Sequence, residues 1–216
     1  ELEQACDELQ IEILGGHTEV SDAVNRPVIT VTGVGKVARS DLLSTGGMRP
    51  GDELVMTKWA GLEGSAIIAA EKRDVLEQTL PAHLIDTAES FLKHISVVPE
   101  AKIAMQHGVH AMHDVTEGGI FGALWEMGAA SGVGIVADLD KIPIRQETVE
   151  ICEFFDLNPY YTDSTGALLV AVEDGFGLVS VLEHEGIHAA VIGRTNDGND
   201  RIIYNQGKKR YLDRPQ

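Results

Sequence analysis

The feature that most restricts the fold of this chain is an alternation of helical and strand patterns that begins near Gly61 and continues almost to the C-terminus. Residues 62–73 are rich in alanine and isoleucine at helical spacing, whereas residues 167–172 form a short apolar run with the length of a buried strand. Because alternating helices and strands pack as layers around one hydrophobic core, the pattern predicts a two-layer α/β arrangement. The other expected helices are 84–95, 99–107, 120–130, 146–155 and 175–185, and the other expected strands are 109–113, 133–137, 188–192 and 201–204.

The first 60 residues have a different pattern. Residues 1–9 are expected to end a helix, and strands are expected at 11–14, 27–37 and 53–57. Three strands with one short helix do not make a self-sufficient domain, so this part is predicted to be the remainder of a larger one. We therefore expect a boundary near residue 60, which divides the chain into 1–60 and 61–216. The chain starts at Glu1 without an initiator methionine, and we expect an N-terminal portion to be missing.

The charge balance limits the classes of ligand. With 17 basic and 34 acidic side chains the net charge is −17, which disfavours nucleic acid and anionic membranes as partners. An acidic protein that handles phosphate is expected to use backbone amides and a divalent cation held by carboxylates. Cys6 and Cys152 show no CxxC spacing, and no signal peptide or membrane-spanning run is present, so a cytoplasmic protein with reduced thiols is expected.

The strongest candidate site is the turn His113-Asp114-Val115-Thr116-Glu117-Gly118-Gly119, in which an expected strand ends in an acid and the next helix begins on two glycines. Gly118 and Gly119 would let backbone amides approach an anion at the helix N-terminus, and Asp114 could hold a metal ion against it. The structural alternative is that Thr116 caps the helix while Glu117 and Asp114 favour its first turn.

A second candidate follows the expected first strand, where Gly15, Gly16, His17 and Thr18 stand together. The unperturbed pKa of histidine is near neutrality, so His17 is a candidate general acid, general base or phosphate contact. A strand that ends in two glycines is also the ordinary pattern of a turn, and that interpretation stays open.

His107, His110 and His113 precede Asp114 and raise the alternative of a zinc site. Within a strand, however, His110 and His113 would be three residues apart and would point to opposite faces. Solvent-facing or structural histidines are therefore the favoured interpretation.

Taken in order, several segments resemble the aminoimidazole ribonucleotide synthetase (AIR synthase) superfamily, and within it the hydrogenase-maturation branch has the most similar pattern. The resemblance covers nearly the whole chain. The segments that carry it are Gly15-Gly16-His17-Thr18, Thr30-Val31-Thr32-Gly33, the loop from Leu43 to the Pro50-Gly51-Asp52 turn, His113 to Gly119, and Asp163-Ser164-Thr165-Gly166-Ala167-Leu168-Leu169.

The resemblance implies a partial N-terminal AIR-synthase-like domain followed by a complete C-terminal-like domain of the α/β class. It implies a homodimer that binds ATP and Mg²⁺ and activates a carbonyl-type or similar small-molecule acceptor by phosphoryl transfer. By position, Asp114 would be the metal-side residue and His17 would lie near the phosphates or the acceptor as the catalytic residue. Nucleotide contacts would come from Gly15, Gly16, Thr18, Thr116, Glu117, Gly118 and Gly119.

Three departures qualify what the resemblance implies. The superfamily's N-terminal acidic and glycine-rich elements are not in this sequence, so the fragment alone is expected to be inactive. The hydrogenase-maturation branch ends in a cysteine, whereas this sequence ends Arg214-Pro215-Gln216, and His17 stands where that branch usually has an acid. The alternative function is therefore a catalytically silent homologue that serves as a dimeric scaffold or binds a small metabolite.

Overall fold

The computed structural model describes residues 2–214, and the chain divides into two units, Glu1–Ser40 and Asp41–Gln216. Among residues 2–38 there is one helix, α1 (Leu2–Leu9), and residues 11–38 contain no helix or strand. The strands expected at 11–14 and 27–37 are therefore wrong for this structure. A strand requires a neighbour whose backbone groups pair with its own, and these segments have no such neighbour among the described residues. Their β-branched side chains, such as Val28, Ile29 and Val31, are largely exposed.

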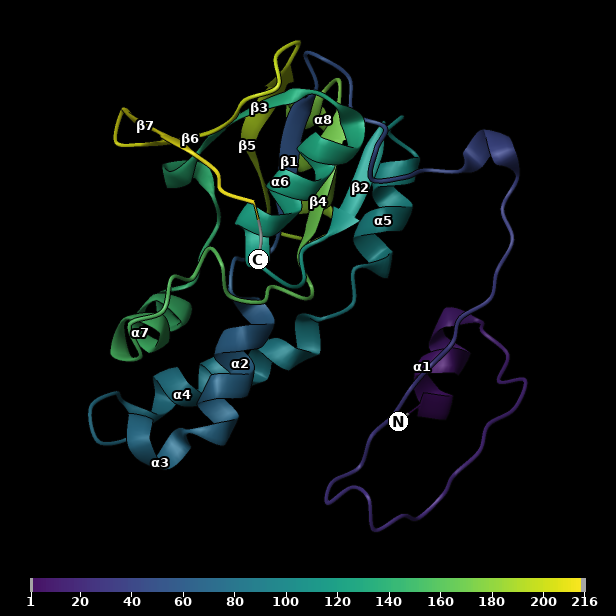
Figure 1. The fold of residues 1–216 in the computed structure, drawn as a ribbon, viewed down its shortest axis with the longest axis vertical. Helices are drawn as coiled ribbons and strands as arrows, with labels where there is room; N and C mark the ends of the chain where they lie inside the picture. The colour runs from purple at the N-terminus through teal and green to yellow at the C-terminus, as the bar shows by residue number, and fades with distance from the viewer. Residues whose placement is uncertain (1, 215–216) are drawn as a thin grey trace. The chain divides into compact units, whose positions relative to one another are not determined.

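The second unit is built on a seven-stranded sheet in the order β2-β4-β1-β5-β3-β6-β7 (Figure 1). Neighbouring strands are antiparallel except for β3 and β6, which run parallel. The strands are β1 (Glu53–Thr57), β2 (Ala111–Asp114), β3 (Gly134–Asp138), β4 (Leu168–Val172), β5 (Ala189–Asn196), β6 (Arg201–Asn205) and β7 (Lys208–Tyr211). The strand expected at 53–57 is confirmed, but it pairs with β4 and β5 inside this sheet. The unit therefore begins before the boundary expected near residue 60.

Helices carry most of the remaining chain and agree with most of the expected ranges. They are α2 (Leu62–Glu71), α3 (Arg73–Leu76), α4 (Ala82–Glu89), α5 (Val98–Met105), α6 (Gly119–Ser131), α7 (Gln146–Phe154) and α8 (Gly175–His184), with 3₁₀ turns η1 (Arg39–Asp41), η2 (Ser90–His94) and η3 (Leu139–Lys141). The helix expected at 84–95 is divided into α4 and the 3₁₀ turn η2, and α3 was not expected. No helix among residues 2–214 is long and apolar enough to cross a membrane.

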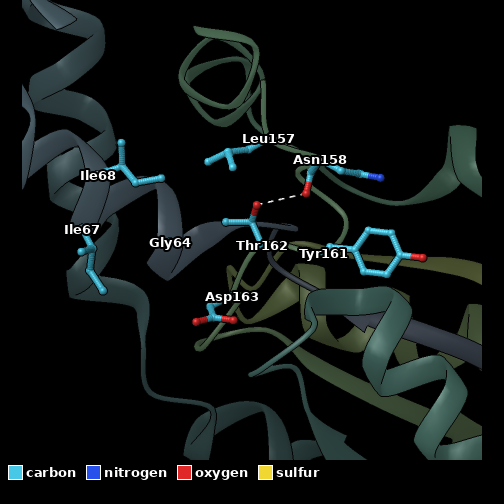
Figure 2. Close-up of a pocket in the computed structure, with 8 residues that line it drawn as sticks. All are labelled: Gly64, Ile67, Ile68, Leu157, Asn158, Tyr161, Thr162 and Asp163. Carbon is cyan, nitrogen blue, oxygen red and sulfur yellow. Dashed lines mark hydrogen bonds between the residues drawn. The ribbon is translucent and has the colours of Figure 1, made fainter. Parts of the chain in front are cut away.

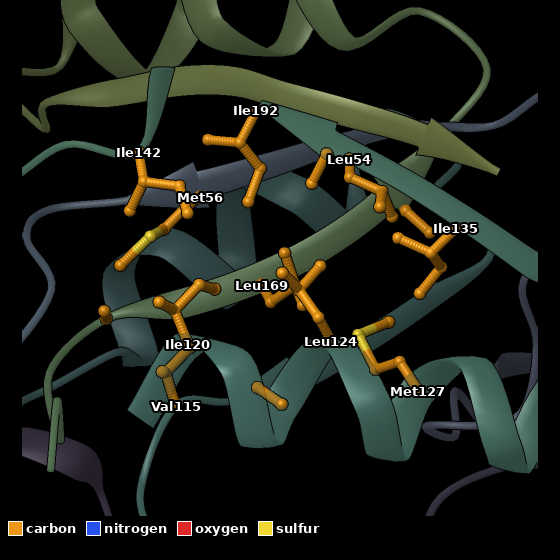
Figure 3. Close-up of a cluster of buried hydrophobic side chains, with 14 of the residues drawn as sticks. Leu54, Met56, Val115, Ile120, Leu124, Met127, Ile135, Ile142, Leu169 and Ile192 are labelled. Atoms are coloured by element: carbon orange, nitrogen blue, oxygen red, sulfur yellow. The ribbon is translucent and has the colours of Figure 1, made fainter. Parts of the chain in front are cut away.

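The central strands are buried on both faces. Alternate residues of β1 belong to different clusters: Leu54 and Met56 pack on the side of α6 (Figure 3), and Val55 packs on the side of α5 and α8. Strand residues alternate between faces, so in a strand with helices on both sides the central positions are apolar on both faces, as Leu54, Val55 and Met56 are here. The α/β class is thus confirmed, and the sheet carries one layer of helices more than the alternation alone predicted.

A third cluster lies among α2, α4 and α7, beyond one end of the strands (Figure 1). Its fully buried residues include Leu62, Leu76, Ile85 and Ile151. This helical group holds the N-terminal end of α2 beside the loop that precedes β4, and that loop also contacts the candidate turn described next.

Candidate functional site

The His113–Gly119 turn connects β2 to α6, as the sequence predicts. Asp114 is the last residue of β2, and Val115 is fully buried with its amide donating to the carbonyl of Ala167 at 3.0 Å. Gly118 has a left-handed backbone conformation with φ of 75° and is the residue that caps α6. The interpretation of Thr116 as the side-chain cap is therefore wrong, since Thr116 contributes only its carbonyl, which accepts from the Gly119 amide at 3.0 Å.

Gly119 is crowded by the chain's own backbone. A Cβ at this position would lie 2.6 Å from the Tyr160 carbonyl oxygen and 2.7 Å from the Thr162 carbonyl oxygen, and φ is +58°. The amide of Phe121 donates to the same Tyr160 carbonyl at 3.2 Å. The segment 158–163 therefore packs directly on the N-terminus of α6, and this contact is enough to require glycine at position 119.

The aromatic side chains of this segment strengthen the contact. Phe121 stacks on Tyr160 with ring centroids 5.4 Å apart and meets Tyr161 edge-on at 5.0 Å. Burial raises the pKa of the Tyr160 phenol, and the nearby Asp140 carboxylate raises it further. Tyr160 therefore remains neutral at physiological pH and acts as a packing group.

The polar side of the turn is formed by Asp114 and His113. Nε2 of His113 lies 2.8 Å from a carboxylate oxygen of Glu126 on α6, and Nδ1 lies 3.6 Å from a carboxylate oxygen of Asp114. The contact with Glu126 orients the His113 imidazole ring, and the Asp114 carboxylate lies beside this ring. The Asp114 side chain itself is 59% exposed. Glu117 is also exposed, and both acids could therefore meet a ligand from solvent.

The three histidines before Asp114 do not converge. His107 contacts the carbonyl of Ile103, whereas His110 contacts Asp52 and Arg49 and His113 contacts Glu126. Among residues 2–214 no group of three or more His, Cys, Asp or Glu side chains could hold a metal ion. The histidines have structural partners, in line with the favoured interpretation.

One supporting segment was not singled out as part of a site from the sequence. The Arg49–Asp52 turn is tied to the residue before β2, since the Asp52 carboxylate accepts from the Arg49 amide at 2.8 Å and lies 2.8 Å from Nδ1 of His110. A Cβ at Gly47 would collide with the His110 carbonyl oxygen. The only sequence signals were the paired glycines and the Pro-Gly-Asp turn, which also occur in ordinary loops.

The loop before β4, which packs on α6, is also hydrogen-bonded to the start of α2. The buried Ser164 hydroxyl accepts from the Gly61 amide at 2.7 Å, at the start of α2, and donates to the Thr162 carbonyl at 2.8 Å. The same segment thus contacts the N-terminal ends of both α2 and α6.

The N-terminal candidates Gly15, Gly16, His17 and Thr18 lie in the first unit. His17 is 84% exposed, and its nearest recorded acid is Glu19 at 4.0 Å. Residues 2–14 contain no strand, so the strand-end geometry on which their role depends is not formed in the described part of the chain. Their assignment to the phosphates or the acceptor stays a prediction.

Comparison with known proteins identifies the family. The family model described as "AIR synthase related protein, C-terminal domain" matches residues 49–205. The chain is 32% identical to the carbamoyl dehydratase HypE of Cupriavidus necator over 188 residues, which cover 82% of this chain and 50% of that protein. The chain thus spans about half the length of this relative.

Solved structures agree on the fold. The crystal structure of E. coli HypE superposes with a TM-score of 0.67 at 23% identity, covering 81% of this chain and 53% of that one. HypE in complex with ATP gives a TM-score of 0.61 at 19% identity, covering 84% and 56%. These similarities to solved structures concern the fold. The family match spans β1 to β6 and includes the whole candidate turn, the Arg49–Asp52 turn and the segment 158–163 that packs on α6. The chain therefore belongs to the AIR synthase related protein family, through its C-terminal domain.

Proposed function

We propose that this chain is part of an ATP- and Mg²⁺-dependent enzyme that transfers a phosphoryl group to a carbonyl-type or similar small-molecule acceptor. The observation that carries the proposal is the β2–α6 turn, where an exposed carboxylate and a glycine-capped helix N-terminus stand together in a chain of this family. Support comes from the relative named as a carbamoyl dehydratase and from the HypE structure solved with ATP.

Asp114 is the group assigned to the metal. Mg²⁺ is usually held by one or two carboxylates while phosphate oxygens and waters complete its coordination, so one exposed carboxylate fits this role. The ion would neutralise charge on the phosphates, which is the main requirement of phosphoryl transfer. Thr116, Glu117, Gly118 and Gly119 are assigned to the nucleotide side of the turn.

The remaining assignments belong to the first unit. Gly15, Gly16 and Thr18 would contact the nucleotide, and His17 would act near the transferred group. We assign this unit to a partial N-terminal AIR-synthase-like domain, and we place its end at Ser40 instead of residue 60, because β1 pairs within the sheet of the second unit. The proposal includes a homodimer and requires the full-length protein for turnover.

Calorimetric titration of the full-length protein with ATP and Mg²⁺ tests the proposal. Asp114→Ala is expected to bind at least about tenfold more weakly, since contacts to charged groups contribute about 1.5–3 kcal/mol. Asp197→Ala is the matched control, because Asp197 is an exposed acid at the β5–β6 connection. Omission of Mg²⁺ should weaken binding to the unmodified protein and to the control far more than to Asp114→Ala.

One result would count against the enzyme and another against the assigned site. If the folded full-length protein binds no nucleotide, the silent scaffold or metabolite-binding homologue is the better description. If Asp114→Ala and Asp197→Ala bind equally well, the nucleotide site lies elsewhere. The dimer is measured separately by sedimentation equilibrium.

A further inference from the structure

A cavity of about 420 Å³ lies between α2 and the segment that packs on α6 (Figure 2). Residues of α2 form one wall, and residues 157–163 form the other. The lining consists of Gly64, Ile67, Ile68, Leu157, Asn158, Tyr161, Thr162 and Asp163. A volume of this size holds a small organic molecule.

The walls of the cavity are largely apolar and accessible. Ile67, Leu157 and Tyr161 are 45%, 43% and 44% exposed, although each is a large hydrophobic side chain. Single exposed apolar residues are common, but three that line one hollow make a surface suited to an apolar ligand. Tyr161 also lines the cavity, but its ring points away from Ile67 and Ile68 (Figure 2) and meets Phe121 edge-on.

The charged group of the cavity lining is acidic. Asp163 lies at the opposite end from Leu157 (Figure 2), and its carboxylate forms no hydrogen bond or ion pair with the residues of 2–214. By contrast, the Thr162 hydroxyl is already used, since it donates to the Asn158 carbonyl at 3.0 Å. The cavity thus combines an apolar body with one available anion.

From this combination we infer that the cavity binds a small organic cation with an apolar or aromatic body, whose ammonium or similar group faces Asp163. The body contacts Ile67 and Leu157. This inference goes beyond the proposed nucleotide site. The two sites share a segment, since the backbone that lines the cavity is also the one that crowds Gly119.

The test uses 2-phenylethylamine as the cation and 2-phenylethanol as the neutral molecule of the same shape, titrated into the full chain without nucleotide. Amide shifts in ¹⁵N spectra are followed at Gly64, Thr162 and Asp163. Dissociation constants on the order of 1–10 mM are expected for ligands of this size. The amine should bind about three- to fivefold more tightly than the alcohol, as expected for an exposed ion pair, and salt should reduce this preference.

Two variants separate the contributions. Asp163→Asn should bring the amine-to-alcohol ratio to about one and leave the affinity for the alcohol unchanged. Leu157→Ser should weaken both probes, whereas Phe176→Ser removes an exposed aromatic on α8, outside the lining, and should weaken neither. Folding of each variant is verified from the dispersion of the same spectra.

The inference is overturned if neither probe shifts the lining amides, or if the amine keeps its preference in Asp163→Asn. Because no nucleotide is present, failure here leaves the proposed function standing. Conversely, a protein that binds the amine but no ATP would refute the proposed function and keep the cavity as a binding site.

Discussion

Replacement of Gly119 by alanine tests what the second glycine of the β2–α6 turn is for. The substitution has two costs: a left-handed backbone disfavours an L-residue by about 1–2 kcal/mol, and the new Cβ would lie 2.6–2.9 Å from three backbone atoms of residues 160–162. Overpacking of this kind costs about 1–3 kcal/mol, while the stiffer unfolded chain returns about 0.4–1 kcal/mol. Gly119→Ala should therefore destabilise the protein by about 1–5 kcal/mol.

Gly108→Ala is a matched control because Gly108 has a φ of +67° and a Cβ added there would have nothing within 4 Å. Gly108→Ala therefore has the free-energy cost of a left-handed backbone but lacks the steric clash of the new Cβ. Urea unfolding should place the midpoint of Gly119→Ala about 0.5–1.5 M below that of Gly108→Ala, with a slope of about 2 kcal/mol/M. Equal midpoints would refute the packing argument. If Gly119→Ala were also the variant that lost nucleotide binding, the glycine would serve the ligand instead.

Three further predictions concern groups away from the turn. Lys58→Met should lower the free energy of unfolding, measured with urea, by about 3–5 kcal/mol, because the buried carboxylate of Glu100, which lies 2.5 Å from the Lys58 ammonium, loses its partner. Replacing both Lys58 and Glu100 by Met should recover much of this loss. An equal loss in the single and the double variant would contradict the coupling. Burial raises the pKa of the Cys152 thiol, so iodoacetamide should modify Cys6 first in the folded protein, and equal rates would contradict the burial. A hydrogen bond from the Ala189 amide lowers the pKa of Glu183 below its ordinary 4.5, so the Glu183 carboxylate contributes to stability above pH 4.5, and this contribution is lost as the pH falls through the lowered pKa. The difference in unfolding free energy between the unmodified protein and Glu183→Gln should shrink over that pH range. A constant difference would contradict the lowered pKa.

The sequence predicted the elements whose formation depends on local pattern. A helix was expected at residues 120–130, and the observed helix α6 (Gly119–Ser131) is longer by one residue at each end. The agreement is close because glycines on both sides of the apolar periodic run define both ends of the helix. The strands expected at 11–14 and 27–37 had an equally good local pattern and did not form. A strand depends on its pairing partner, which a local pattern does not contain.

The hairpin of β6 and β7 shows the opposite error. Lys208–Tyr211 was not predicted as a strand because it is charged and lies at the edge of the sheet, where polar side chains are tolerated. The available signal was the Gln206-Gly207 pair, which has positive φ at both residues and makes the tight turn. Here the turn chemistry was informative and the hydrophobic pattern was not.

The same distinction applies to the candidate site. A Cβ at Gly47 or Gly119 would meet backbone atoms of other parts of the chain, so packing already explains the second glycine of the pairs at 46–47 and 118–119. A residue whose position the fold does not explain is better evidence of a ligand. Asp114 meets that condition, because its carboxylate stays exposed beside an imidazole that Glu126 already orients. Substitution of Asp114 is therefore a sharper test of nucleotide binding than substitution of the glycines that first draw attention to the turn.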